Sequence, residues 1–224
     1  MSWLPTVEPV SIDFSVSPFH APAVVLIGPP GVGKSTIGRL LAEKLSCPLI
    51  DTDLIIEQHV AKSIAQIFQD DGEPTFRALE ASLLASLCAA KIEEEYQGPA
   101  HTFGVVIATG AGLPVNPGNL ERLQSLGHLV CLVAPVEVLA HRLSGAKDRP
   151  LLAPRSVDQS AQSSNSQLRS RAREQEQAAL LIRLEAIVQA RKPIYDRAKY
   201  VIETNLRSSQ QVVELIVDLV ARSS

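Results

Sequence analysis

The sequence is poor in aromatic residues and has no excess of positive charge. Phe, Trp and Tyr make up 4% of the 224 residues although 46% are apolar, so the core must consist mainly of Ala, Val, Ile and Leu. This apolar content excludes a wholly disordered chain. A formal net charge of -3 argues against a general nucleic-acid binder, because such proteins neutralise many phosphates with Lys and Arg. Any anionic ligand must therefore be bound by a few placed groups.

Cysteine is also scarce, and long apolar runs are absent. Cys47, Cys88 and Cys131 lie far apart, each in or beside an apolar segment, which predicts buried free thiols and a reducing, cytoplasmic compartment. The longest apolar runs, such as 129–136, fall far short of the roughly 20 residues that cross a bilayer, so no membrane association is expected. The first Lys or Arg is Lys34, whereas export signals begin with positive charge, so residues 1–21 are expected to be a surface extension and not an export signal.

The chain length favours a single domain with additions to it. Residues 1–21 contain prolines and no helical period, which predicts an irregular N-terminal arm before one domain over 22–224. Within that domain, residues of about 153–176 are rich in Ser and Gln and almost lack apolar side chains. Such a segment cannot bury enough surface to offset its ordering entropy, so we expect a polar, mobile insert. The whole is expected to be a monomer.

Short apolar runs alternate with amphipathic helical patterns along the domain. This alternation predicts an α/β fold, a doubly wound five-stranded parallel sheet flanked by helices. The predicted strands cover residues 23–27, 48–50, 105–108, 129–133 and 200–203. The predicted helices cover residues 34–46, 54–60, 63–70, 73–90, 117–126, 136–144, 167–198 and 209–222.

A glycine-rich loop follows the first predicted strand. Residues 28–35, GPPGVGKS, match G-x-x-x-x-G-K-[ST] between an apolar strand and a helix. Gly31 and Gly33 allow a backbone nest whose N–H groups point at phosphate oxygens. Lys34 is expected to reach the β- and γ-phosphates, and the Ser35 hydroxyl to bind Mg²⁺. The loop predicts nucleotide binding by Gly31, Val32, Gly33, Lys34, Ser35 and Thr36, and the lack of an N-K-x-D guanine signature favours a small-molecule kinase.

Two carboxylates close the second predicted strand. Asp51 and Asp53 are thereby placed at the carboxyl edge of the sheet, where ligands of open α/β sheets bind. One interpretation is that they only cap the next helix. In the other, Asp51 orients a Mg²⁺-bound water, while Asp53, one pleat further on, accepts a hydrogen bond from a substrate hydroxyl and could take its proton.

In their order along the chain, these motifs resemble the shikimate kinase family. The set comprises GPPGVGKST, LIDTD, SIAQIFQDDGEPTFRALE, VIATGAG, AKDRPLL and ARKPIYDRAKYVIETN, within about residues 23–222. The resemblance implies a P-loop fold like that of the nucleoside monophosphate kinases, with a mobile lid at about 145–153. It also implies ATP-dependent phosphorylation of shikimate at its 3-hydroxyl, a step of chorismate and aromatic amino acid biosynthesis, with ATP and Mg²⁺.

The resemblance assigns roles to residues by position. Asp53, Arg77 and Arg191 bind shikimate, since a guanidinium can grip its carboxylate bidentately. Arg149, in the lid, reaches over the phosphates and is catalytic together with Lys34 and Asp53. Further implied contacts are those of Arg142 and Arg207 with the adenine, of Gly110, Ala111 and Gly112 with shikimate, and of Ser35 and Asp51 with the metal.

Two departures from the family pattern keep alternatives open. The family has three glycines where this chain reads Gly110-Ala111-Gly112. At positive φ Ala111 would cost roughly 1 kcal/mol, and at negative φ it would be nearly silent. The second departure is the polar insert. Another small P-loop kinase, such as one for gluconate, and a binding or regulatory module that has lost turnover therefore remain as alternatives.

Overall fold

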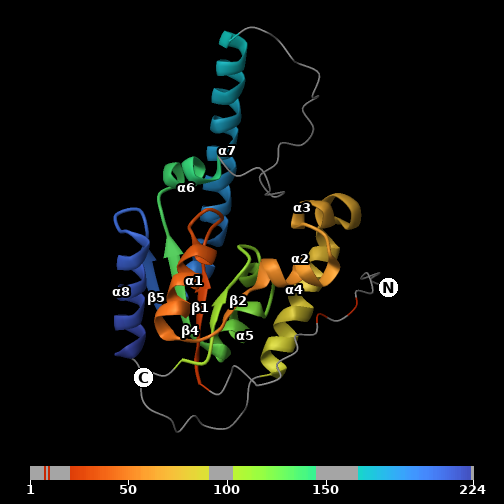
Figure 1. Cartoon of the computed structure of the whole chain (residues 1–224). Coiled ribbons are helices and arrows are strands. Elements are labelled where there is room, and N and C mark those ends of the chain that lie inside the picture. The colour runs from red at the N-terminus through yellow and green to blue at the C-terminus, as the bar shows by residue number, and fades with distance from the viewer. Residues whose placement is uncertain (1–7, 9, 11–20, 91–102, 145–165, 223–224) are drawn as a thin grey trace.

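The structure, a computed structural model, describes residues 21–90, 103–144 and 166–222, together with Glu8 and Val10 (Figure 1). Five strands form one sheet in the order β2-β3-β1-β4-β5, and every neighbouring pair is parallel. The prediction of a five-stranded parallel sheet is therefore confirmed. The strands are β1 (Ala23–Ile27), β2 (Leu49–Asp51), β3 (Val106–Ala108), β4 (Gly127–Val133) and β5 (Tyr200–Glu203).

Helices connect the strands and cover both faces of the sheet. The α-helices are α1 (Lys34–Leu45), α2 (Thr52–Val60), α3 (Ile64–Gln66), α4 (Gly72–Ala89), α5 (Asn119–Leu126), α6 (Val136–Leu143), α7 (Ser166–Tyr195) and α8 (Ser209–Ala221). A π-helical turn, η1 (Ile67–Asp71), joins α3 to α4, and a 3₁₀ turn, η2 (Leu113–Val115), follows β3.

Strand β1 lies in the middle of the sheet, and all five of its residues are fully buried. Because strand side chains alternate between faces, Ala23, Val25 and Ile27 enter one apolar cluster and Val24 and Leu26 enter the other. The first cluster lies under α2, α4 and α5, and the second under α1, α6, α7 and α8. A continuous apolar run is what a strand buried on both faces requires.

One predicted boundary, at the carboxyl edge of the sheet, was wrong, and one predicted helix differs in type. Helix α2 begins directly after Asp51, so Asp53 lies in the first helical turn and not one pleat further along a strand. The predicted helix 63–70 is a short α-helix that continues as the π-helical η1. Its start is fixed by a capping box between Ser63 and Gln66, and it ends at Gly72, whose φ is 83°.

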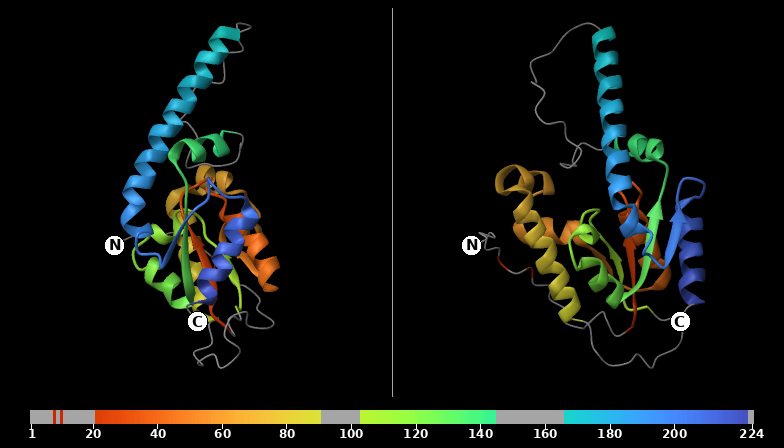
Figure 2. Two further views of the ribbon diagram at one scale, coloured as in Figure 1. Left: turned by 90° about the vertical axis from the view of Figure 1, so that its left-hand side faces the viewer. Right: turned by 180° about the vertical axis from the view of Figure 1, so that it is seen from behind.

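Helix α7 is the longest element. The predicted helix 167–198 is observed as Ser166–Tyr195, with Pro193 in its last turn. Its C-terminal turns pack beside the sheet, whereas its N-terminal turns rise beyond the sheet's carboxyl edge (Figure 2). The predicted insert thus contributes its residues from 166 onward to this helix, and residues 153–165, like the predicted lid at 145–153, lie outside the described residues.

All three cysteines are free, but their burial differs from the prediction. Cys131 is buried in β4, whereas Cys47 and Cys88 are half-buried. Helix α1 ends at Leu45, two residues before Cys47, and Cys88 lies in the last turn of α4, so both thiols sit at helix ends and not in the interior. None of the helices that the structure describes combines the length and the apolar character needed to cross a membrane.

Candidate active site

The loop between β1 and α1 adopts the backbone that its glycines permit. Gly31 and Gly33 have φ values of 78° and 102°, in the left-handed region that side chains disfavour. At Gly31 a Cβ would also collide with the Leu143 side chain of α6. The prediction that these two glycines shape the loop is confirmed, and the N-terminus of α1 follows at once.

Lys34 spans the mouth of this loop. Its Nζ donates to the carbonyl oxygens of Gly28 at 2.9 Å and Pro29 at 3.1 Å, and the residue is 8% exposed. The ammonium is thus held over the nest, where it can turn from neutral carbonyls to a more favourable anionic partner. The next two residues, Ser35 and Thr36, are exposed at the helix start.

Asp51 caps the helix that carries Asp53. Its Oδ1 accepts from the backbone N–H groups of Asp53 at 3.2 Å and Leu54 at 3.4 Å, so the capping interpretation holds for Asp51. The cap orients the carboxylate at the sheet edge, beside the glycine-rich loop. Between the two acids, the hydroxyl of Thr52 accepts from the N–H of Gly110 at 2.7 Å, which ties this turn to the loop after β3.

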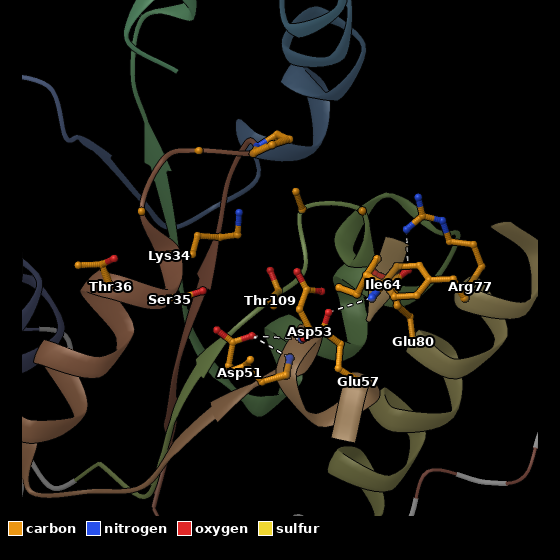
Figure 3. A pocket seen from close by; sticks show the side chains of 17 residues that line it. Lys34, Ser35, Thr36, Asp51, Asp53, Glu57, Ile64, Arg77, Glu80 and Thr109 are labelled. Carbon is orange, nitrogen blue, oxygen red and sulfur yellow. Dashed lines mark hydrogen bonds and ion pairs between the residues drawn. The ribbon is translucent and has the colours of Figure 1, made fainter. Parts of the chain in front are cut away.

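A cleft of about 380 Å³ runs from the glycine-rich loop to helix α4. Figure 3 shows Lys34 near one end, Arg77 and Glu80 at the other, and Asp53 between them. The lining residues are Pro30, Gly31, Gly33, Lys34, Ser35, Thr36, Asp51, Asp53, Leu54, Glu57, Ile64, Phe76, Arg77, Glu80, Thr109, Ala111 and Gly112. One cavity is therefore lined by the glycine-rich loop, the two acids and Arg77.

Arg77 is oriented by two carboxylates of its own helix. Its Nη1 donates to Oε2 of Glu80 at 2.7 Å, while its Nη2 and Nε donate to Oε1 of Glu73 at 2.9 and 3.2 Å. The guanidinium also lies 5.5 Å from the ring centroid of Phe76. Three of the five guanidinium N–H groups bond to described residues, and the other two have no partner among these and could meet a ligand in the cleft.

Glu80 is the site residue that sequence reasoning missed. Its side chain is 0% exposed, and its Oε1 has no hydrogen-bond partner among the described residues. Burial raises the pKa of Glu80 to about 7, although the charge of Arg77 opposes the shift and Asp53 adds to it. The available signal was an acid three residues after Arg77 on a helix face that is otherwise apolar.

Arg191, in helix α7, contacts the loop after β3. Arg191 Nη1 donates to the carbonyl oxygen of Ala111 at 2.7 Å. Arg191 is not among the residues that line the cleft, but its charge lowers the pKa of Glu80. The structure thus joins Arg191 to the cleft through the Ala111 carbonyl, and its predicted contact with substrate remains a prediction.

The glycine pattern of this loop has a steric cause. A Cβ at Gly110 would collide with Oδ1 of Asp53, and a Cβ at Gly112 would collide with the guanidinium of Arg77. Among the non-glycine residues that the structure describes, only Ser46 and Ala61 have positive φ, so Ala111 carries its Cβ without backbone strain. Ala111 is therefore the nearly silent case of the two that the sequence left open.

A second cavity, of about 360 Å³, lies on the other side of the glycine-rich loop. Arg142 crosses it, with Nη1 donating to the carbonyl of Val32 and to Oγ1 of Thr204, both at 3.2 Å, and Nη2 donating to the Thr204 carbonyl at 3.3 Å. Arg207 is exposed at its rim and donates to the carbonyl of Glu203. Val32, Gly33, Thr36, Arg142 and Arg207 are thus brought together, whereas Arg149 lies outside the described residues.

Comparisons with known proteins agree with this geometry. The family model described as shikimate kinase matches residues 30–221. A shikimate kinase of Pelotomaculum thermopropionicum is 34% identical over 194 residues, which are 87% of this chain and 92% of the relative. One of Pseudomonas fluorescens is 34% identical over 200 residues, or 89% and 96% of the two chains.

Solved structures give the same result. The shikimate kinase of Acinetobacter baumannii in complex with shikimate has a TM-score of 0.70 at 30% identity and covers 94% of this chain and 97% of its own. The enzyme of Aquifex aeolicus has a TM-score of 0.60 at 29% identity and covers 90% and 96%. On its sheet, its site and these matches, this chain belongs to the shikimate kinase family.

Proposed function

We propose that the protein transfers the γ-phosphoryl group of ATP to the 3-hydroxyl of shikimate. The observation that carries the proposal is the single cleft in which a phosphate-binding loop and its lysine face an arginine that has two N–H groups left for a ligand. Family membership adds the substrate, since the Acinetobacter relative is described in complex with shikimate.

The end of the cleft at helix α4, where Arg77 lies, would bind the carboxylate of shikimate. Arg77 is fixed in direction by Glu73 and Glu80, so it offers a preorganised fork at little entropic cost. Leu54, Ile64 and Phe76 line the cleft between the polar groups and suit the carbon ring. Arg191 would add positive charge behind Ala111, and the backbone of 110–112 would contact the substrate.

Asp53 lies between the two ends and would orient the reacting hydroxyl. A carboxylate that accepts the hydroxyl hydrogen bond aligns the oxygen with the γ-phosphorus and can take its proton. Position matters more than basicity here, because phosphoryl transfer depends mainly on alignment and charge neutralisation. The place of Gly110 against the Asp53 carboxylate serves that alignment.

The loop end of the cleft would bind the phosphates. Lys34 would exchange its carbonyl partners for β- and γ-phosphate oxygens, while Arg142 and Arg207 border the second cavity as a place for adenine. Ser35 and Asp51 line the same cleft and supply oxygen ligands, a donor set that fits Mg²⁺, which takes few protein ligands and completes its shell with phosphate and water. The metal would neutralise charge on the transferred group.

Arg149 and the lid complete the proposal by resemblance. A cation delivered on closure would stabilise the transferring group and exclude water, which limits ATP hydrolysis. We also propose that the protein acts as a monomer in the cytoplasm, where free thiols such as Cys131 stay reduced.

The function is tested by coupled measurement of ADP release. Turnover should require shikimate and Mg²⁺. Gluconate should not replace shikimate, since the sequence motifs around Arg77 and Arg191 distinguish shikimate kinases from gluconate kinases. Equal rates with gluconate would favour the other small-molecule kinase. Shikimate binding without any turnover would favour the binding or regulatory module.

The loop after β3 gives a paired prediction. Gly112→Ala is expected to raise the KM for shikimate by about 10-fold or more, because the new Cβ displaces the Arg77 guanidinium. Ala111→Gly, its neighbour and matched control, is expected to change the KM by less than about twofold, since Ala111 is unstrained. Steady-state kinetics with varied shikimate check both. Equal effects of the two substitutions would contradict the steric account.

The raised pKa of Glu80 gives a prediction about stability. Between pH 4.5 and about 7 the folded protein keeps a proton that the unfolded chain has released, so this group stabilises the fold at low pH and its contribution is lost as the pH rises. Glu80→Gln should therefore gain on the order of 3 kcal/mol relative to the wild type between about pH 5 and about pH 8. Urea unfolding of both proteins at the two pH values measures the difference. A difference that does not change with pH would contradict the assignment.

A further inference from the structure

Val10, in the predicted N-terminal arm, is fixed against helix α4 by both of its backbone polar groups. Its N–H donates to Oγ of Ser82 at 2.9 Å, and its carbonyl oxygen accepts from Oγ of Ser86 at 2.6 Å. Its side chain is 0% exposed and belongs to the same apolar cluster as Phe76 and Leu83 of α4. Figure 1 draws the described arm residues in red beside this helix.

This contact has the features of a specific attachment. Serine hydroxyls within helices commonly donate to the carbonyl one turn earlier, but the Ser86 hydroxyl donates to the Val10 carbonyl, and the Ser82 hydroxyl accepts from the Val10 N–H. The two serines lie one helical turn apart, a spacing that suits the N–H and C=O of one residue. Val10 is therefore buried with both backbone groups paired, which avoids the cost of an unsatisfied polar group.

The same helix forms the end of the proposed active site that would bind the carboxylate of shikimate. Arg77 and Glu80 precede Ser82 on α4, so a shift of the helix at Ser82 moves them as one rigid body. The start of α4 is irregular, because the helix follows the π-helical η1 and begins at Gly72, whose φ is 83°. The packing of the buried apolar face of α4 and its attachment at Ser82 together set where Arg77 lies.

The tolerance for such a shift is small. The guanidinium of Arg77 lies so close to Gly112 that no Cβ fits there, and the Glu80 carboxylate lies close to Gly110. Movement of α4 toward the loop is blocked by these contacts, and movement away opens the cleft. The fork of Arg77 then no longer meets a carboxylate at bonding distance, and alignment losses of this kind are costly.

We propose that Val10 is a positioning residue. By binding Ser82 and Ser86 it helps to fix the position of α4 relative to the loop after β3, and so the affinity of the site for the carboxylate of shikimate. Val10 touches neither substrate nor nucleotide and acts through α4. The arm thereby supports one end of the cleft and leaves the phosphate end unaffected. This inference rests on the proposed function, because its readout is shikimate binding.

The test compares two buried valines in the full-length protein. Val10→Ala keeps the two backbone hydrogen bonds but removes the buried methyl groups that pack Val10 against α4, so it should weaken shikimate binding by about 5- to 10-fold in calorimetry, with nucleotide binding changed by less than about twofold. Val220→Ala is the matched control, since Val220 is also 0% exposed but lies in the last turn of α8, on the opposite face of the sheet. It should lower the melting temperature and leave both affinities unchanged.

The serine hydroxyls provide a second pair that does not depend on cavity size. Ser82→Ala leaves the buried N–H of Val10 without a partner and should weaken shikimate binding, whereas Ser82→Thr keeps a hydroxyl and should restore it. If Val10→Ala and Val220→Ala lower stability alike and shikimate affinity is unchanged, the arm only stabilises the fold and the inference is wrong. Failure of the wild type to bind shikimate would instead refute the proposed function.

Discussion

Lys34→Ala is expected to lower kcat for phosphoryl transfer by about 10³-fold while the affinity for shikimate changes by less than about twofold. The Lys34 ammonium is buried at the mouth of the glycine-rich loop, where water cannot replace its charge as the γ-phosphoryl group departs. Shikimate is proposed to bind at the other end of the cleft, so its affinity should not depend on this cation.

The measurement is ADP release at saturating shikimate, together with calorimetric titration of shikimate. Lys44→Ala is the control, because Lys44 lies on the same helix but is exposed. It should behave as the wild type. A Lys34→Ala variant that is folded and retains full turnover would contradict the role of Lys34 in phosphoryl transfer. If the wild type and the Lys34→Ala variant are equally inactive, the protein is a module without turnover.

Arg77→Lys should raise the KM for shikimate by about 100-fold with a much smaller change in the KM for ATP. Lysine keeps the positive charge but lacks the planar fork, so it cannot bond to Glu73, Glu80 and a ligand carboxylate together. The exposed Arg122 of α5 gives the matched control, and Arg122→Lys should be silent.

Glu80 complicates the Arg77 variant and also makes it interpretable. With the guanidinium gone, the buried Glu80 carboxylate loses its bond to Nη1, which a shorter-reaching lysine replaces poorly, and the fold itself is weakened. The double variant Arg77→Lys with Glu80→Gln removes that unpaired charge and should recover stability without recovering the KM. Recovery of both would mean that Arg77 serves the fold and not the substrate.

The sheet was predictable because its signal is local. Each strand is a short, mainly apolar run, buried on both faces in β1 and β3 and partly exposed in the edge strand β5, and each run lies within two residues of the observed strand. The glycine-rich loop was predictable for the same reason, since Gly31, Gly33 and Lys34 are neighbours in sequence and are fixed by one turn. Local chemistry was therefore sufficient for the fold and for the conformation of the glycine-rich loop.

The end of the cleft at helix α4 was predictable only in part, because it is assembled from segments that are distant in the sequence. Arg77 was found through the resemblance, yet its orientation depends on Glu80, whose burial is set by the packing of α4 and not by its neighbours in sequence. Asp53 was placed on a strand because nothing in the sequence separated strand end from helix start. The contact of Val10 with Ser82 joins residues 72 positions apart, beyond any local pattern.

The charge distribution links the composition to the site. The chain carries a formal net charge of -3, but Lys34 and Arg77 lie in the same cleft, and Arg191 donates a hydrogen bond to the loop after β3. Composition excluded a general binder of polyanions, and the fold places a few cations where two small anions could meet. Acidic partners such as Glu73 and Glu80 keep one of these cations oriented.

The most direct test of the proposed reaction is to follow both products of one incubation with ATP, Mg²⁺ and shikimate. Phosphorus NMR should show shikimate 3-phosphate forming in equal amount to ADP, with no ADP above background when shikimate is omitted. ADP that appears at the same rate without shikimate, or a phosphoryl group attached to any other hydroxyl, would contradict the account.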